Sequence, residues 1–229
     1  NAAFFLVDHY GNPTLAPLLD ELATAALNSK KTDELQHQIL TSHPALNENR
    51  ILFVSRRQYT RDHHNTATIF QTGEINTASF VPGGALKILD LKTGSVDIVF
   101  ETLDGMVRDP ELSPDGKCIV FSYRKNIDHD YHICEIDVTG ENFRQLTSAK
   151  GVADIDPVYT PAGDIIFTST REPKYCMCNR HIMGNLYRMN ADGANIMQIG
   201  KSTLFEGHAS VLPDGRILYD RWEYVDRNF

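Results

Sequence analysis

The feature that most constrains the fold of this chain is a segment that recurs three times in its C-terminal part. Residues 109–122, 156–169 and 209–219 each place a turn of Pro-Asp-Gly or Pro-Ala-Gly before a short strand of apolar and β-branched side chains. The turn glycines of successive copies lie 47 and 52 residues apart, a spacing typical of propeller blades. Each unit can be divided into four short strands, which is the content of one blade.

The repeats predict an all-β fold, a β-propeller of four-stranded blades that occupies residues 50–229. About three and a half blades are present, whereas closed propellers have about 4 to 8. Because a propeller must close to remove its open strand edges, we expect about six or seven blades in the complete protein. The remaining blades would come from the rest of the chain or from a partner chain.

The first 49 residues differ from the rest and form a separate predicted segment. Apolar residues recur at three-to-four spacing in residues 15–27 and 35–40, among good helix formers. This pattern predicts one or two amphipathic helices that end before Pro44 and Asn47. The predicted domains are therefore a short α-helical N-terminal segment, 1–49, and the propeller blades, 50–229.

Charge and hydropathy exclude two classes of partner. The 22 Lys and Arg against 30 Asp and Glu give a net charge of −8, which repels nucleic acid over most of the surface. The longest apolar run, residues 2–7, is far shorter than the roughly 20 residues of a membrane-spanning helix, so we expect no membrane span. An anionic ligand would need a locally basic patch.

Part of the repeat resembles a known family. Ser-Pro-Asp-Gly-Lys followed by Ile-Val-Phe-Ser within residues 113–122, and Arg-Gln-Leu-Thr at 144–147, resemble the TolB-like repeat. The resemblance covers residues 50–229 and implies an exported propeller, so we expect a periplasmic or secreted protein.

A narrower resemblance is carried by residues 65–68, 186–193 and 216–224. These segments are similar to the propeller part of hydrazine synthase alpha-subunit-like proteins and to propeller-fold polysaccharide lyases of the ulvan type. The covalent haem signature Cys-x-x-Cys-His is missing, so we expect no haem, and no nucleotide either.

The lyase resemblance implies β-elimination of an acidic polysaccharide, with His and Tyr as proton carriers and an Arg that neutralises the uronate. The first hypothesis is therefore an exported lyase that cleaves a uronate-containing, possibly sulfated, anionic polysaccharide. One alternative is a non-catalytic TolB-like propeller that binds a protein partner. The other alternative is a propeller subunit of a hydrazine-synthase-like redox complex.

Two long predicted loops, residues 59–82 and 173–184, carry polar residues. Basic residues are in excess in and beside them, and Arg171, Lys174 and Arg180 belong to the second stretch. Long loops on a rigid scaffold are where functional residues usually lie. Imidazole titrates near neutral pH and suits a base, whereas guanidinium groups pair with carboxylates. The candidate catalytic residues are His63, His64, Tyr123 and Tyr131, and the candidate substrate-binding residues are Arg57, Arg61, Asn65, Arg124, Arg221 and Trp222. A solvated polar loop without a catalytic role is the other interpretation of the two adjacent histidines.

The spacing Cys-x-Cys-x-x-His at Cys176, Cys178 and His181 suggests a Zn²⁺ site with His208 as a fourth ligand. Four protein ligands would make the zinc structural, whereas an open position that holds water would make it catalytic. The alternative is a pair of free or disulfide-bonded cysteines in a loop.

Other polar residues have structural interpretations. Cys118 and Cys134 alternate with apolar residues and are expected to be buried. His132 is expected to be a sheet residue, and Asp109 and Asp156, which precede proline, are expected to organise turns at the channel mouth.

Overall fold

The computed structural model describes residues 17, 29–42, 50–57, 80–172, 174–175 and 182–223. By its backbone contacts the chain divides into two compact units, one of residues 1–52 with 88–97 and the other of residues 53–87 with 98–229. The predicted domain boundary after residue 49 stays a prediction.

In the smaller unit, the described helix is α3 (Ser29–Ser42), which confirms the helix predicted at 35–40. Leu35, on the apolar face of this helix, is 5% exposed. Of the helix predicted at 15–27, the structure describes residue 17 alone. None of the described helices combines the length and hydropathy that a membrane crossing requires.

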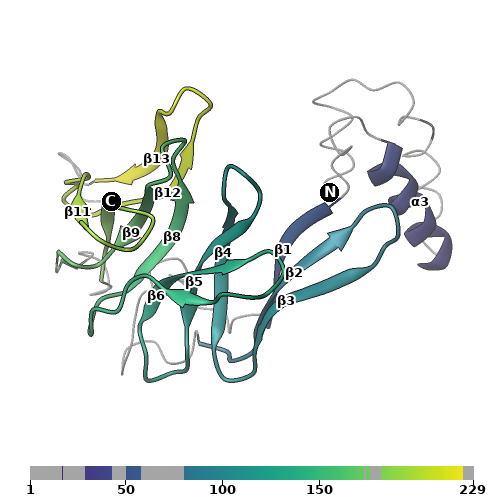
Figure 1. The fold of residues 1–229 in the computed structure, drawn as a ribbon, viewed down its shortest axis with the longest axis horizontal. Helices are drawn as coiled ribbons and strands as arrows, with labels where there is room; N and C mark the ends of the chain where they lie inside the picture. Colours follow the sequence, from purple (N-terminus) through teal and green to yellow (C-terminus); the bar gives the residue numbers. More distant parts are fainter. Residues whose placement is uncertain are drawn as a thin grey trace. The chain divides into compact units, whose positions relative to one another are not determined.

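The described strands fall into four sheets with the orders β1-β2-β3, β4-β5-β6-β7, β11-β10-β9-β8 and β12-β13. Two sheets have four strands in sequence order, and the pairings given for them are antiparallel. Figure 1 shows the sheets of the larger unit following one another, from the teal to green strands β4, β5 and β6 to the yellow β12 and β13. The strands are β1 (Arg50–Arg56), β2 (Gly84–Asp90), β3 (Val96–Thr102), β4 (Met106–Leu112), β5 (Cys118–Arg124), β6 (Tyr131–Asp137), β7 (Arg144–Gln145), β8 (Asp154–Tyr159), β9 (Ile165–Ser169), β10 (Asn185–Met189), β11 (Met197–Gln198), β12 (Phe205–Val211) and β13 (Ile217–Trp222).

This arrangement confirms the predicted all-β propeller of four-stranded blades. The first strands of successive sheets contact each other, β4 with β8 and β8 with β12, as inner strands of a propeller do. The turn glycines of the three sequence repeats all have positive φ, from 70° to 88°, which is the conformation that requires glycine there.

The core lies between neighbouring sheets of the larger unit. Val120 of β5 and Ile133 of β6 pack in one cluster with Phe167 of β9 and Tyr187 of β10. Val120, Ile133 and Phe167 are 0% exposed. The apolar faces that the alternating sequence predicts are therefore buried against the next sheet, which fixes the blades against each other.

One glycine sets how closely two sheets approach. Gly193, in the turn after β10, has φ of 85°, and a Cβ atom there would lie 2.5 Å from the carbonyl oxygen of Leu146. A side chain at this position would push the turn away from the end of β7. Backbone contact, as well as side-chain packing, therefore spaces these two blades.

Candidate functional site on the inner strands

The inner strands β4, β8 and β12 share an irregularity that gathers polar side chains. The pairing register shifts inside each of these strands, and at each shift one non-glycine residue has positive φ. These residues are Asp109 (51°), Asp156 (55°) and His208 (50°). Left-handed backbone is costly outside glycine, and β-bulges often aim side chains next to active sites. Since these strands contact each other, the three side chains come to one region.

We name this region the inner-strand cluster, and His208 is its half-exposed imidazole. The Nδ1 atom of His208 lies 3.1 Å from each carboxylate oxygen of Asp220, on the neighbouring strand β13. Its Nε2 atom lies 3.7 Å from Oδ2 of Asp156. Half of the His208 side chain is exposed, 51%, so an oriented imidazole is accessible to a ligand. The inner-strand cluster consists of Arg108, Asp109, Ser122, Asp156, His208 and Asp220.

The rest of the cluster is a buried carboxyl pair beside an arginine. Arg108 Nε donates to Asp109, and its Nη2 atom lies 4.0 Å from Oδ1 of Asp156. The hydroxyl of Ser122 donates to Asp109 at 3.1 Å and accepts from the backbone N–H of Asp156 at 3.1 Å. Burial alone would lower the pKa of Arg108. The ion pair with Asp109 and the charge of Asp156 have a larger effect and raise this pKa, so the guanidinium stays charged.

Asp156 carries the largest carboxyl perturbation of the cluster. Burial, and then the neighbouring charge of Asp109, raise the pKa of Asp156 to about 6, against the lowering influence of Arg108 and His208. Its Oδ2 atom is buried and has no hydrogen-bond partner among the described residues. The carboxyl pair therefore holds a proton more tightly in the folded protein than in the unfolded chain.

This raised pKa predicts a pH dependence of stability. Because Asp156 holds its proton more tightly in the folded protein, protonation stabilises the fold. This stabilisation is complete below pH 3.8, the pKa in the unfolded chain, and is lost as the pH rises through about 6. Asp156→Asn removes this titrating group. As the pH is raised from about 4 to about 7, the free energy of unfolding of wild type should therefore decrease, relative to that of the variant, by an amount on the order of a few kcal/mol. Denaturant unfolding across this range measures the difference. A parallel pH dependence in the two proteins would contradict the raised pKa.

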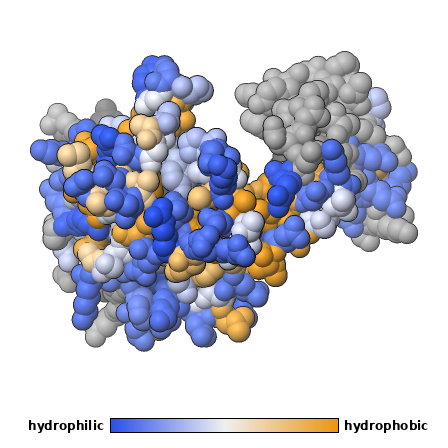
Figure 2. Space-filling model, viewed as in Figure 1, coloured by the Kyte–Doolittle hydropathy of each residue, from blue (hydrophilic) through white to orange (hydrophobic). Residues whose placement is uncertain are grey.

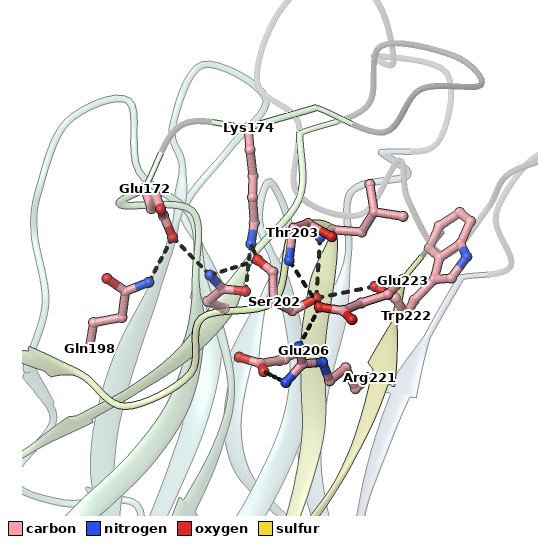
Figure 3. A network of polar contacts seen from close by, with 11 residues as sticks. Glu172, Lys174, Gln198, Ser202, Thr203, Glu206, Arg221, Trp222 and Glu223 are labelled. Carbon is pink, nitrogen blue, oxygen red and sulfur yellow. Dashed lines mark hydrogen bonds and ion pairs between the residues drawn. The ribbon is translucent and has the colours of Figure 1, made fainter. Parts of the chain in front are cut away.

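A second polar network surrounds the end of β13 and fixes Arg221 and Trp222 (Figure 3). Arg221 Nη1 lies 3.6 Å from Oε1 of Glu206, whose side chain is 1% exposed, and Nη2 of Arg221 contacts Glu223. The hydrogen bond to Glu223 and the negative charge of Glu223 raise the pKa of Arg221. The hydroxyl of Ser202 donates to the carbonyl of Trp222 at 3.2 Å. Arg221 keeps 47% of its side chain exposed, so these contacts orient an accessible guanidinium.

The same network ties down the connections that follow β9 and β11. Lys174 donates to Oδ1 of Asn185 at 2.6 Å and to the carbonyl of Ser202. Glu172 accepts hydrogen bonds from Asn185 at 2.8 Å and from Gln198 at 2.7 Å. Burial lowers the pKa of Lys174. Lys174, counted in sequence as part of a basic patch, therefore serves an internal contact, and the exposed positive charge near it is smaller than predicted.

The structure places the remaining described candidates on or beside the sheet β4–β7. The guanidinium of Arg124 donates to the carbonyls of His129 and Ile127, and the residue is 3% exposed. Tyr131 is also 3% exposed and donates to the sulfur of Met106 at 2.8 Å. These contacts give both residues structural roles, and their predicted roles towards a substrate stay predictions.

Tyr123 and Arg57 are more accessible. Tyr123 is half-buried and packs edge-on against Phe100, with ring centroids 5.2 Å apart. Arg57 follows β1 and is exposed. Several other candidates lie outside the described residues, and the predictions made for them stay untested: His63, His64, Arg61, Asn65, Cys176, Cys178 and His181.

Sequence reasoning missed most of the inner-strand cluster. It treated Asp109 and Asp156 as turn organisers, singled out His208 as a zinc ligand, and did not consider Asp220 or Arg108. The signal that could have found the cluster is the repeat itself, because Asp109, Asp156 and His208 occupy the same bulge of three successive repeats. Among the described residues, no group of three His, Cys, Asp or Glu side chains is arranged to hold a metal ion. Cys134 is buried, as expected, whereas Cys118 is half-buried, and both are free thiols.

Comparison with solved structures shows which class of fold this is. Hydrazine synthase from Kuenenia stuttgartiensis is similar at a TM-score of 0.56 and 20% identity, over 75% of this chain and 27% of that chain. TolB from Acinetobacter baumannii is similar at a TM-score of 0.48 and 22% identity, over 59% of this chain and 31% of that chain. Oligogalacturonate lyase from Vibrio parahaemolyticus is similar at a TM-score of 0.42 and 15% identity, over 58% of this chain and 34% of that chain.

The likeness to hydrazine synthase agrees with the fold that the sheets show, part of a β-propeller. TolB and hydrazine synthase are also the proteins whose repeats the sequence motifs resemble. The chain spans about a third or less of the length of each of these three structures. No protein-family model matches the sequence. At these identities the likeness shows the fold alone, and function has to be argued from the residues.

Proposed function

We propose that this chain is the propeller part of a polysaccharide lyase that cleaves a uronate-containing polysaccharide, sulfated or unsulfated, by β-elimination. The observation that carries the proposal is the geometry of His208. Its Nδ1 atom is held by Asp220, its Nε2 side faces Asp156, and half of the side chain is accessible. An imidazole that one carboxylate orients at Nδ1, and whose side chain stays half accessible, suits proton abstraction beside a carboxylate.

The reaction needs a proton carrier and a cation. His208 takes the proton from the carbon that bears the uronate carboxylate, and the electron pair of that C–H bond forms a double bond to the next ring carbon. The bond from that carbon to the glycosidic oxygen breaks, and the imidazolium returns its proton to this oxygen. Asp220 and Asp156 stabilise the imidazolium between the two steps.

Arg221 is the cation that we assign to the substrate carboxylate. It lies on β13, and Glu206 and Glu223 fix its position while 47% of its side chain stays exposed. Guanidinium groups bind carboxylates and sulfates through paired hydrogen bonds, and a fixed cation stabilises the charge that develops on the uronate. The adjoining Trp222, 38% exposed, offers a ring face to a sugar.

The visible surface of the larger unit is consistent with a polar ligand. Figure 2 shows hydrophilic residues over most of this face, with apolar residues in smaller patches. A polysaccharide is too large to enter a cell unassisted, so the proposal includes a periplasmic or secreted location. It also includes further blades, supplied by the rest of the protein or by a partner chain, that complete the substrate channel.

The proposal is tested by mixing the complete protein with a panel of uronate polysaccharides and following the ultraviolet absorbance of the unsaturated product. A rise with one of these polymers is the expected result. His63→Ala and His64→Ala are made in parallel, because both were candidate bases in the sequence. Activity in both variants supports a base on the inner strands, whereas loss in one of them moves the base to that loop. No rise with any polymer, in folded protein, would overturn the lyase and favour a propeller that binds a protein partner.

The zinc site also stays a proposal, on Cys176, Cys178 and His181. We expect about one zinc per chain in purified protein and its loss in a Cys176→Ser, Cys178→Ser variant, because two thiolates and one imidazole provide three of the four usual ligands. Metal analysis by mass spectrometry measures the zinc content of both proteins. Since we assign His208 to proton transfer, His208→Asn should keep its zinc. Loss of zinc from the His208→Asn variant would show that His208 is the fourth zinc ligand, as the sequence predicted.

A further inference from the structure

A cavity of about 670 Å³ lies on the sheet β4–β7 and at the end of β3, apart from the inner-strand cluster. Its walls come from strands β3, β5, β6 and β7 and from the connections that follow β5, β6 and β7. They combine aromatic rings with lysine, histidine and aspartate side chains, and no function described above uses this cavity. The lining residues that matter here are Phe100, Tyr123, Lys125, His132, Phe143 and Lys150.

Three aromatic rings form one wall. Phe100 and Phe143 are stacked, with centroids 5.5 Å apart and planes inclined by 11°. Tyr123 meets both rings edge-on, at 81° and 89°. Phe143 is 44% exposed although it packs against the other two rings. A rigid and partly exposed aromatic wall of this kind suits the apolar face of a sugar ring, because such side chains bind with little loss of conformational entropy.

The polar wall contains cations that no internal contact uses. Lys125 and Lys150 are exposed, and neither makes a hydrogen bond or an ion pair with any described residue. Two carboxylates, Asp128 and Asp130, line the same cavity, and Asp130 accepts a hydrogen bond from Gly151 N–H at 2.8 Å. A ligand that carries both a negative group and hydroxyl groups would satisfy the cations and the carboxylates together.

His132 adds an unused polar atom. It pairs with Tyr123 across β5 and β6, so both side chains lie on the cavity face of the sheet. Its Nδ1 atom is buried and has no hydrogen-bond partner among the residues described. Burial lowers the pKa of His132, so the imidazole is neutral near pH 7 and can accept or donate a hydrogen bond. Buried polar atoms are usually paired, so an unpaired one in a cavity wall indicates a missing partner.

We infer that this cavity is a saccharide subsite that binds one sugar ring bearing a carboxylate. The ring lies against Phe143 and Phe100, and Lys125 and Lys150 bind its carboxylate. The inference rests on the proposed function for the identity of the polymer. The cavity spans strands β5 to β7, one to three strand spacings from the inner strand β4 of the same sheet, roughly 5–15 Å. A polymer chain across this blade would therefore reach both the cavity and the β4 residues of the inner-strand cluster.

The test measures binding and does not require turnover. The affinities of a galacturonic-acid disaccharide and of the neutral disaccharide cellobiose are determined by calorimetry for wild type, Phe143→Ala and Lys150→Ala. We expect the acidic disaccharide to bind more tightly than cellobiose, and each variant to weaken it by about tenfold, a typical loss for one good contact. Met197→Ala and Lys117→Ala, which change an exposed apolar side chain and an exposed amino group elsewhere, are the matched controls and should bind as wild type does.

The outcomes separate this inference from the proposed function. Unchanged affinity in both cavity variants overturns the subsite, and so does equal binding of cellobiose in wild type. If Phe143→Ala is less stable, Lys150→Ala still decides, because it changes an exposed charge only. Absence of unsaturated product with every polymer overturns the lyase, while disaccharide binding that depends on Phe143 and Lys150 would still support the subsite.

Discussion

His208→Asn should lower the rate of product formation by about 100- to 10,000-fold, the range measured when a positioned acid–base group is lost. Asparagine tolerates left-handed backbone, so φ of 50° at this bulge can be kept while the imidazole is removed. The rate is measured from the absorbance of the unsaturated uronate under substrate saturation. The unfolding midpoint of the variant is measured beside it, and it should stay close to that of wild type.

Two further variants make this result specific. Asp220→Asn keeps the shape of the residue but removes the charge that holds Nδ1 of His208, so we expect a smaller loss that falls mainly on kcat. Ser210→Ala changes an exposed residue on the same strand and should leave the rate unchanged. A His208→Asn protein that turns over substrate at nearly the wild-type rate would show that the base lies elsewhere.

Arg171→Met should lower the free energy of unfolding by about 3–5 kcal/mol, the cost of leaving one member of a buried ion pair alone. Arg171 Nη1 pairs with Asp154, whose side chain is 0% exposed, and it also donates to Ser169 at 2.7 Å. The other carboxylate oxygen of Asp154 already has no partner among the described residues. Without the guanidinium, the carboxylate would be buried with its charge uncompensated. Urea denaturation of the two proteins measures the difference.

The matched control replaces both members of the pair. In the double variant Arg171→Met, Asp154→Asn, the buried charge is gone, so most of the lost stability should return. If the single variant unfolds at the wild-type urea concentration, then Arg171 does not compensate Asp154, and its side chain is free to bind a ligand as the sequence suggested.

The fold could be predicted from the sequence because its signals are local. A turn with glycine, followed by alternating apolar residues, is repeated at blade spacing, and each copy specifies the same hairpin. The burial of Val120 and Phe167 follows from this alternation alone. The helix at 35–40 was predicted in the same way, from its period.

The candidate site was harder to predict, because it depends on contacts between repeats. Nothing local to His208 indicates that Asp220 holds its Nδ1 atom, since that contact needs the pairing of β12 with β13. Arg171 and Lys174 were counted as surface charge, and only the packed structure shows that Asp154 and Asn185 engage them. Residue type predicted which groups are present, whereas their partners come from tertiary structure.

The bulge shared by the three inner strands has a consequence for how such a protein can change. Each blade offers one left-handed position that points to the same region, and the residues on either side of it keep their pairing with the next strand. A substitution at that position exchanges a functional group without altering the strand register of its sheet. The chain carries Asp, Asp and His at these positions, and a related propeller could carry a different set of three. Blades built this way separate the part of the sequence that specifies the scaffold from the few positions that specify the chemistry.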